Sequence, residues 1–503
     1  MLDTPVRPEA IPPQRLTWRV RQDLIVAGAG AVAGGVLFLL VHQALIDDAY
    51  ITLSYARNVA FHLHWGLTEQ QTSNTATSPL NVLLLAGITA LVRHPLVAVA
   101  VVLALTAAAT AVWSARMARY AGLSWVMPVL TVVALLANPL LMSTIGLETL
   151  TGAGLVVGLA YYALVGRPVA AGVVSGLLVL ARPDLLVFSL VAVLGVAALR
   201  RRAPLVIGVA VLVVLPWHVV SWLLLGSALP DTFLLKVGEK WGNWDVTTGG
   251  LLYWLTYPMA TALAAAPAAL GVVCLAGWVL PGMRRNVNVP GGCAVPVVTG
   301  VGGLAHLAVF ASLGTAPYHW YYGPAVAALS CCAAFTAAVL LVRAPRPLGV
   351  LVAAPLAVLA FVGTGFAFAR GVPWTVAPFT TNWALPGEYA RVGADLADRS
   401  PGRVISSPGE IGTLAYFCQC AIVDVFSDRG AMNEVIRERE QEVGPVQRWL
   451  LRLNYRYSDR DVLRARPDQQ LRYDNGKRAD GPDQWDVQSP WNQTGRLVLE
   501  STG

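Results

Sequence analysis

Asp47 and Asp48 are adjacent carboxylates at the end of the first long apolar run, where a membrane helix would emerge into water. Because an ionised group is costly inside a bilayer, a carboxylate pair at its edge predicts a functional site. Such a pair can take a proton from an acceptor hydroxyl, or hold a divalent cation (Mg²⁺, Mn²⁺ or Ca²⁺) beside a phosphate leaving group. The alternative is a solvated helix end, whose acidic residues complement the helix dipole.

Polar side chains that could bind a sugar follow the aspartates. Helical spacing places Asp48, Thr52 and Tyr55 on one face, and residues 72–80 read TSNTATSPL. Hydroxyl and amide groups of this kind can hydrogen-bond a sugar. The candidate sugar- or acceptor-binding residues are Tyr50, Tyr55, Asn74, Thr77, Ser78, Glu148 and His319. The alternative is ordinary loop composition, with Glu148 beginning a helix and His319 in an interfacial aromatic belt.

Three basic residues could bind a donor phosphate, on which charge develops as it departs. They are Lys236, Arg182 and Arg57. Lys236 follows an apolar run, so the alternative is a lysine that snorkels to the membrane surface. Arg182 belongs to Ala181-Arg182-Pro183-Asp184 and either pairs locally with Asp184 or faces a polar cavity.

The elements that must position these residues are mostly membrane helices. The chain is 56% hydrophobic and 13% charged, which excludes an ordinary soluble domain and indicates a polytopic membrane protein. We predict a cytoplasmic N-terminus (1–23), a transmembrane domain (24–369) with a first outer loop at 45–78, and an extracytoplasmic soluble domain (370–503).

The soluble domain has the pattern of a small α/β module. Strand-like runs occur at 404–406 and 421–425, and a helix is predicted at 387–399. Residues after about Arg452 are rich in arginine, aspartate, proline and glycine, so we expect them to be loosely ordered.

The hydropathy pattern predicts about eleven transmembrane helices. They span residues 24–44, 79–92, 96–116, 123–142, 149–166, 170–199, 204–225, 250–279, 294–314, 320–342 and 347–369. The 170–199 span is overlong and carries Arg182, Pro183 and Asp184 in its middle, so one pass there is broken, re-entrant or miscounted.

Loop charges predict the orientation in the plasma membrane. The arginines expected in the cytoplasm are Arg15, Arg19, Arg21, Arg93, Arg200, Arg201, Arg202, Arg284, Arg285, Arg343 and Arg346. On this layout Arg116 and Arg119 fall outside and disagree. The first loop and the soluble domain lie together on the outer face.

Charge and cysteine content exclude two classes of partner. The net charge is +7, but the arginines concentrate in short loops, so no nucleic acid is expected. The six cysteines form no secreted-domain framework and no zinc spacing; they neither imply nor exclude disulfides.

Several landmarks occur in an order that resembles the GT-C superfamily of membrane glycosyltransferases. They are Asp47-Asp48-Ala49-Tyr50-Ile51, Tyr55-Ala56-Arg57-Asn58, Asn74-Thr75, Thr77-Ser78-Pro79, Gly146-Leu147-Glu148-Thr149, Ala181-Arg182-Pro183-Asp184 and Leu229 to Lys236. The first loop is similar to that of actinobacterial arabinofuranosyltransferases, which use decaprenyl-phosphoryl arabinofuranose. The resemblance implies an inverting transfer with Asp47 as base and Asp48 orienting it or binding a cation, although the two roles could be reversed.

The leading hypothesis is therefore an inverting glycosyltransferase of cell wall biogenesis. It would move arabinofuranose from a polyprenyl-phosphate donor, embedded among membrane lipids, to a cell-envelope polysaccharide or glycolipid acceptor. A second reading replaces arabinofuranose with mannose or another hexose. A third is a transporter or lipid flippase, which is disfavoured because the polar groups gather at one boundary and no internal repeat is detected.

Overall fold

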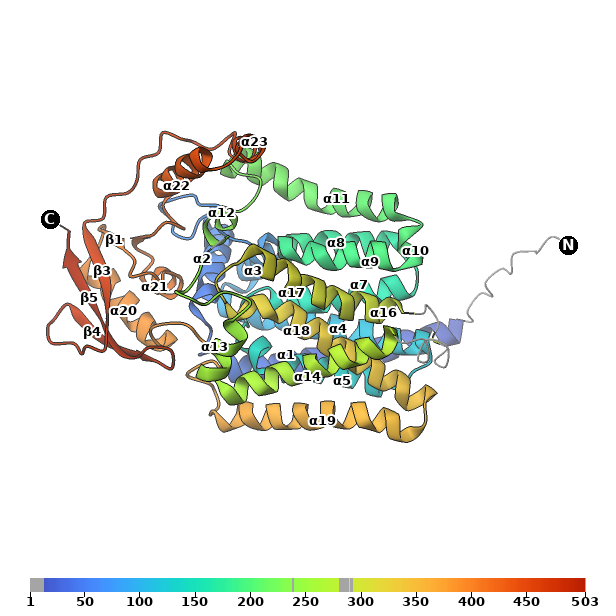
Figure 1. Cartoon of the computed structure of the whole chain (residues 1–503). Coiled ribbons are helices and arrows are strands. Elements are labelled where there is room, and N and C mark those ends of the chain that lie inside the picture. The colour runs from blue at the N-terminus through green and yellow to red at the C-terminus, as the bar shows by residue number, and fades with distance from the viewer. Residues whose placement is uncertain (1–12, 238, 280–288, 290–292, 503) are drawn as a thin grey trace.

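Long apolar helices form a bundle with a small mixed domain at one end, in a computed structural model that describes residues 13–237, 239–279, 289 and 293–502 (Figure 1). Within these residues, seven helical segments are long and apolar enough to cross a membrane. They are α1 (Pro13–Val41), α4 (Pro95–Ala121), α11 (Ala203–Val220) with η2 (Ser221–Leu225), α14 (Pro258–Val279), α16 (Ala294–Pro296) to α17 (Gly302–Leu313) through η3 (Val297–Val301), α18 (His319–Arg343) and α19 (Arg346–Ala369).

Shorter helices complete the bundle and its connections. The apolar ones are α3 (Pro79–Val92), α5 (Val126–Leu136), α7 (Thr149–Leu164), α8 (Pro168–Ala181) and α9 (Leu186–Gly195), which follows the single turn η1 (Pro183–Leu185). The connecting ones are α2 (Asp47–His62), α6 (Pro139–Met142), α10 (Ala197–Arg200), α12 (Thr232–Lys236) and α13 (Gly249–Thr256). Eleven passes therefore remain a prediction.

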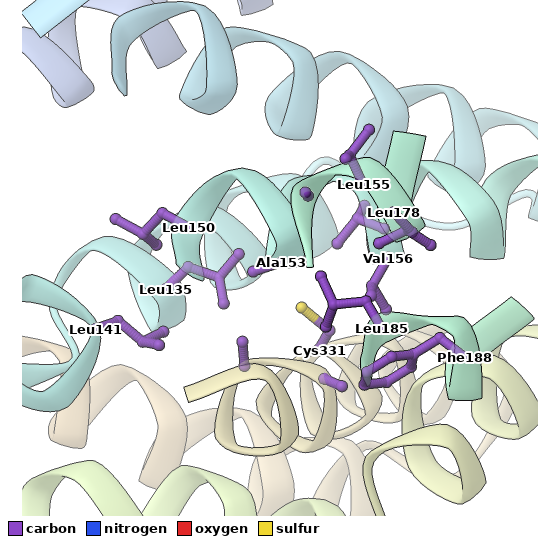
Figure 2. Packing of buried hydrophobic residues seen from close by; sticks show 14 of the residues in the cluster. Leu135, Leu141, Leu150, Ala153, Leu155, Val156, Leu178, Leu185, Phe188 and Cys331 are labelled. Carbon is purple, nitrogen blue, oxygen red and sulfur yellow. The ribbon is translucent and has the colours of Figure 1, made fainter. Parts of the chain in front are cut away.

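Helix α18 lies at the centre of the bundle. In its most apolar window 83% of residues are buried, against 6% for α11 and 17% for α19, which lie at the periphery. Apolar side chains of α5, α7, α8, α9 and α18 point toward one another and fill the space between these helices (Figure 2). Helices α1 and α4 pack closely through small residues: a Cβ on Gly30 would lie 2.7 Å from the Ala107 carbonyl oxygen.

The predicted span at 170–199 is a hairpin rather than one pass. Helix α8 ends at Ala181, Arg182 is extended, and the chain reverses through η1 into α9. Gly166, before α8, contacts Ala198 in α10, so the two far ends of the hairpin meet. Pro183 explains the break, because proline disfavours the helical conformation in the preceding residue.

The conflict over Arg116 and Arg119 has a structural answer. Both guanidinium groups bind the Asp23 carboxylate near the start of α1, so α4 ends at the end of the bundle where α1 begins. Helix α3, predicted as a pass, instead packs on α2, and Arg93 after it lies over the Phe61 ring of α2. Helix α3 therefore starts and finishes at one end of the bundle. The predicted layout placed Arg116 and Arg119 on the side opposite the N-terminal arginines, and it placed Arg93 on the same side as those arginines. Both placements are wrong for this reason.

Some residues of the predicted N-terminal segment and of the predicted cytoplasmic arginines lie outside the described residues. Residues 1–12 of the predicted cytoplasmic N-terminus are not among the described residues, nor are Arg284 and Arg285. The membrane location is consistent with the apolar helices; the side on which each terminus lies is still a prediction.

The C-terminal domain contains a five-stranded sheet of order β2-β1-β3-β5-β4. The strands are β1 (Val404–Ser406), β2 (Ala421–Val423), β3 (Gln469–Asn475), β4 (Gln484–Ser489) and β5 (Gln493–Ser501). Strand β1 is parallel to β2 and β3, and the pairs β3–β5 and β4–β5 are antiparallel, with Leu471 opposite Leu499. The helices are α20 (Pro386–Arg399), α21 (Gly412–Cys418), α22 (Arg429–Glu442) and α23 (Pro445–Asn454).

The structure tests two sequence predictions for this domain. The strand predicted at 404–406 is confirmed, the one predicted at 421–425 is shorter and ends at Val423, and the helix predicted at 387–399 is confirmed as Pro386–Arg399. The loosely ordered region expected after Arg452 is wrong, because β3 to β5 lie there and bury Leu471, Val487 and Leu497 in the core of the domain. A disulfide joins Cys418 and Cys420 between α21 and β2.

Candidate active site

A cavity of about 520 Å³ lies where the helical bundle meets the C-terminal domain. Helices α2, α12 and α21 lie between the bundle and the sheet (Figure 1). The cavity brings together seven of the residues singled out in the sequence: Asp47, Asp48, Thr77, Ser78, Glu148, Arg182 and Lys236. Its far wall comes from the C-terminal domain, including Asn382, Trp383, Glu410, Asp424 and Trp491.

Asp47 ties the first loop to the C-terminal domain. The backbone N–H of Gly412 donates to its Oδ2 at 2.9 Å, and that of Thr413 donates to Oδ1 at 2.7 Å. Its own N–H donates to Asn382 Oδ1 at 3.2 Å. The carboxylate is 5% exposed and meets the first turn of α21, where free N–H groups and the helix dipole favour an anion. Both oxygens are thus engaged in holding two parts of the chain together.

Burial changes the acidity of Asp47. Desolvation raises the pKa of this carboxyl above its usual value, and the neighbouring charge of Asp48 adds to the rise. The backbone donors of Thr413 and Gly412 oppose that rise because they stabilise the ionised form.

Asp48 faces the cavity and pairs with Lys236. Its side chain is 28% exposed, and Lys236 Nζ lies 3.7 Å from its Oδ1. The ammonium also lies over the Tyr318 ring, 4.3 Å from the ring centre. Burial alone would lower the pKa of Lys236, but the Asp48 charge and smaller contributions from neighbouring acidic groups together outweigh it, and the pKa is raised. A proton acceptor and a permanent cation therefore lie side by side in the cavity.

Arg182 belongs to a buried ion network at the turn between α8 and α9. Its guanidinium donates to both Asp184 oxygens, at 2.6 and 2.8 Å, and to Glu148 Oε1 at 3.2 Å. His306 Nε2 lies 2.7 Å from Asp184 Oδ2. The two alternatives given for Arg182 in the sequence analysis are both observed: Arg182 pairs locally with Asp184, and it also lines the cavity. Its charge is shared with two carboxylates, which leaves less of it for an incoming phosphate.

Five predicted site residues do not belong to the cavity lining that the described residues form. Tyr50 packs between the Tyr416 and Phe417 rings of α21. The Tyr55 hydroxyl lies 2.6 Å from Ser73 Oγ, and Asn74 Nδ2 donates to Ser221 and Ser227. His319 is fully buried beside Tyr253 and Phe379. Arg57 donates to the Tyr416 carbonyl oxygen. These five side chains make contacts within the protein and do not line the cavity.

Arg57 holds α2 against the C-terminal domain. Its Nη1 donates to the Tyr416 carbonyl oxygen at 2.7 Å, and the guanidinium lies over the Tyr416 ring. A hydrogen bond from a charged donor contributes roughly 1.5–3 kcal/mol. We therefore expect Arg57→Met to lower the thermal unfolding temperature without changing KM for a lipid-linked donor. A raised donor KM at unchanged stability would return Arg57 to the phosphate site.

The divalent cation expected at the acidic pair stays a prediction. Each Asp47 oxygen accepts a backbone N–H and Asp48 faces an ammonium, so water and the donor phosphate would have to supply most of the ligands of such a cation. Within the described part of the chain, no group of three or more histidine, cysteine or acidic residues could hold a metal. No step below therefore depends on the predicted cation.

Glu410 is a cavity residue that the sequence does not reveal. Its Oε1 accepts from Asn382 Nδ2 at 3.1 Å, Trp383 N–H lies within 3.2 Å of both oxygens, and the Tyr389 hydroxyl donates to Oε2. The sequence shows a turn at Pro408 and Gly409, but nothing local marks this acid among 29 acidic residues. Burial and then the Asp47 charge raise its pKa to about 8.

This raised pKa predicts a pH-dependent stability. A carboxyl whose folded pKa lies above its unfolded pKa stabilises the fold fully below the unfolded value, and that stability is lost as pH rises through about 8. The thermal unfolding temperature of the wild type should therefore fall between about pH 5 and 9. Glu410→Gln, which cannot ionise, should flatten this part of the profile. Parallel profiles for the two proteins would contradict the assignment.

The helical bundle with a small α/β domain at its end agrees with the predicted fold class and is shared with solved structures of low sequence identity. Particular solved structures carry this likeness. ArnT from Cupriavidus metallidurans bound to undecaprenyl phosphate has a TM-score of 0.55 and 14% identity, with 98% of this chain and 99% of that chain covered. The Archaeoglobus fulgidus oligosaccharyltransferase in the apo form has a TM-score of 0.53 and 13% identity, with 89% and 69% covered.

Other comparisons add little. Arabinofuranosyltransferase AftD from Mycobacteria has a TM-score of 0.42 and 17% identity over 77% of this chain and 30% of that chain, too low to bear on the donor sugar. No family model and no curated protein matches the chain.

Proposed function

We propose that the protein is an inverting glycosyltransferase that moves a sugar from a polyprenyl-phosphate donor to a cell-envelope glycan or glycolipid acceptor. The observation that carries the proposal is the cavity beside the helical bundle, in which a partly exposed carboxylate and a mostly buried ammonium lie 3.7 Å apart. A lipid-linked substrate can reach such a site laterally from the bilayer. Two proteins that share the fold bind lipid phosphates in their solved structures. ArnT binds undecaprenyl phosphate, and AglB, the oligosaccharyltransferase from Archaeoglobus fulgidus, binds a dolichol-phosphate.

Asp48 is the base in this proposal, which reverses the roles expected from the sequence. The acceptor hydroxyl attacks the anomeric carbon and loses its proton to Asp48, while the bond from that carbon to the phosphate oxygen breaks on the opposite face. Its electron pair leaves with the polyprenyl phosphate. Asp47 is less suited to this role because both of its oxygens accept backbone N–H groups. It positions Asp48 by fixing the first turn of α2.

Lys236 is the principal cation for the departing phosphate, and Arg182 is the secondary one. Because the phosphate leaves on the face opposite the base, the Lys236 ammonium turns from Asp48 toward the phosphate when the donor binds. The 3.7 Å between Lys236 and Asp48 is longer than a direct hydrogen bond, so the ammonium retains N–H donors for a phosphate oxygen. Positive charge fixed where negative charge develops stabilises the transition state. Thr77 and Ser78 line the cavity and supply hydroxyl groups for a sugar.

The donor sugar we propose is arabinofuranose, on the resemblance of the first loop, with transfer on the outer face of the plasma membrane. The test is an assay in lipid nanodiscs with synthetic polyprenyl phosphates carrying arabinofuranose, mannose or another hexose, and an oligosaccharide acceptor. We expect a pentose mass increment on the acceptor. If the acceptor gains only the mass of a hexose, the donor sugar is a hexose instead of arabinofuranose, and the proposed reaction is unchanged. Absence of transfer from every donor, with correctly folded protein, would contradict the function.

A further inference from the structure

Four tryptophans line the cavity: Trp320 of α18 is buried, and the other three come from two domains. Trp241 lies in the loop between α12 and α13, whereas Trp383 and Trp491 belong to the C-terminal domain. The Trp241 ring lies 6.0 Å from the Trp491 ring in an edge-to-face arrangement. All three side chains are partly exposed. Partly exposed aromatic rings that face a polar cavity offer flat apolar surface in contact with water.

Each tryptophan is held in place by its surroundings. Trp241 and Trp244 exchange two backbone hydrogen bonds of 3.0 Å across a tight turn. Trp383 donates its backbone N–H to Glu410 and packs on the Tyr473 ring, 4.9 Å away between ring centres. Trp491 donates its backbone N–H to Ser489 Oγ at 3.2 Å. Rings fixed in this way lose little conformational freedom when a ligand binds.

Gly409 gives Trp383 its position. It has a φ of +120°, and a Cβ there would lie 2.8 Å from the Trp383 ring. The ring therefore lies directly over the turn that carries Glu410. The same turn thus supports both the buried acid and one aromatic wall of the cavity.

The indole N–H groups of these tryptophans are free for a ligand. Among the described residues, none of the three indole nitrogens has a hydrogen-bond partner, whereas Trp374 and Trp485 each donate to an oxygen within the protein. A buried or half-buried indole usually finds such a partner. Three rings with unused donors are suited to a ligand that has both apolar faces and hydroxyl groups, as a sugar has.

A continuous row of aromatic contacts joins this surface to the proposed reaction centre. The Trp241 ring lies 4.7 Å from the Tyr318 ring, and Tyr318 lies under the Lys236 ammonium, which pairs with Asp48. The Tyr318 hydroxyl donates to Glu239, which holds that ring in place. A molecule bound on the tryptophans would therefore occupy the same cavity as Asp48.

We infer that Trp241, Trp383 and Trp491 form the acceptor subsite and bind the sugar rings of an acceptor oligosaccharide. This inference rests on the proposed function and names the residues that recognise its acceptor. The lipid chain of the donor is the other candidate occupant. Its hydrocarbon has to lie along the membrane helices, whereas two of the three tryptophans come from the domain beyond the end of the bundle. Their unused N–H groups also favour a hydroxylated ligand.

The test is the kinetics of Trp491→Ala and Trp241→Ala in the full-length protein. An aromatic stacking contact contributes about 0.5–1.5 kcal/mol, so each variant should raise the acceptor KM by about 2- to 12-fold. The donor KM should not change, and kcat at saturating acceptor should stay within about twofold. Trp491→Phe should recover most of the acceptor affinity, because it retains a ring. Trp449→Ala is the matched control, since Trp449 is 62% exposed on α23 and does not line the cavity.

A direct binding measurement separates this inference from the proposed function. Saturation-transfer NMR with the oligosaccharide alone needs no donor and no turnover. We expect a signal with the wild type and with Trp449→Ala, and a weaker signal with Trp491→Ala at equal thermal stability. Equal signals, an unchanged acceptor KM or a raised donor KM in the tryptophan variants would overturn the inference. Such a result would leave the proposed function intact as long as Asp48 is still required for transfer.

Discussion

Asp48→Asn should reduce sugar transfer by about 10²- to 10⁴-fold, the range that a positioned general base contributes. The amide cannot take the proton of the acceptor hydroxyl, yet it has nearly the same shape. Asp48 is 28% exposed, but the change leaves the Lys236 ammonium without its ion-pair partner, so we expect a modest fall in the thermal unfolding temperature. The measurement is kcat at saturating donor and acceptor, together with thermal unfolding of the same preparation.

Asp47→Asn is the matched control, because it makes the same chemical change one residue earlier. An amide presents one acceptor oxygen, so one of the N–H groups of Gly412 and Thr413 would lose its partner. A buried donor without a partner costs roughly 1–3 kcal/mol, so this variant should lose stability. Full activity in Asp48→Asn, combined with loss of activity in Asp47→Asn at unchanged stability, would restore Asp47 as the base.

Lys236→Met should lower kcat by about 10²- to 10³-fold, the effect seen when one stabilising donor is removed from a transition-state anion. Methionine keeps much of the stem that packs against Tyr318 but removes the charge. The loss should be smaller with a donor whose leaving group is a weaker base, since such a group needs less stabilisation. The measurement compares kcat for the ordinary polyprenyl-phosphate donor and for the donor with the weaker-base leaving group, in both the wild type and the variant.

Arg182→Met provides the comparison for Lys236. It would leave Asp184 and Glu148 buried without their cation, so we expect a large loss of stability in addition to any loss of activity. Equal activity of Lys236→Met and wild type would remove Lys236 from the phosphate site and leave Arg182 as the remaining candidate.

The sequence predicts the membrane bundle because apolar composition, segment length and the cost of buried charge act locally. The same cost identifies Asp48, Lys236 and Arg182, which the fold brings to one cavity from distant parts of the chain. The role of α3 cannot be predicted in this way. Helices α3 and α8 are each 14 residues long, mostly apolar, and begin with proline, yet one packs on α2 and the other forms half of a hairpin. Only tertiary contacts distinguish them.

The division of labour between the two aspartates is also a tertiary property. Adjacent residues of identical type carry the same sequence signal, and the N–H groups that engage Asp47 lie 365 and 366 residues further along the chain. Glu410 is hidden for the same reason, since its burial depends on Asn382, Trp383 and Tyr389. Arg57 and Tyr55 show the converse: their residue types suit a ligand, but neighbouring backbone and hydroxyl groups already engage them.

The contact of Asp47 with α21 has a consequence for biosynthesis. The walls of the cavity include residues 47 and 491, so the compartment is closed only after the chain has been made and folded as far as residue 491. A ribosome-bound or prematurely terminated chain that contains the apolar helices up to Ala369 would still lack this compartment. Insertion of these helices into the bilayer and completion of the cavity are therefore separate events in the life of the protein.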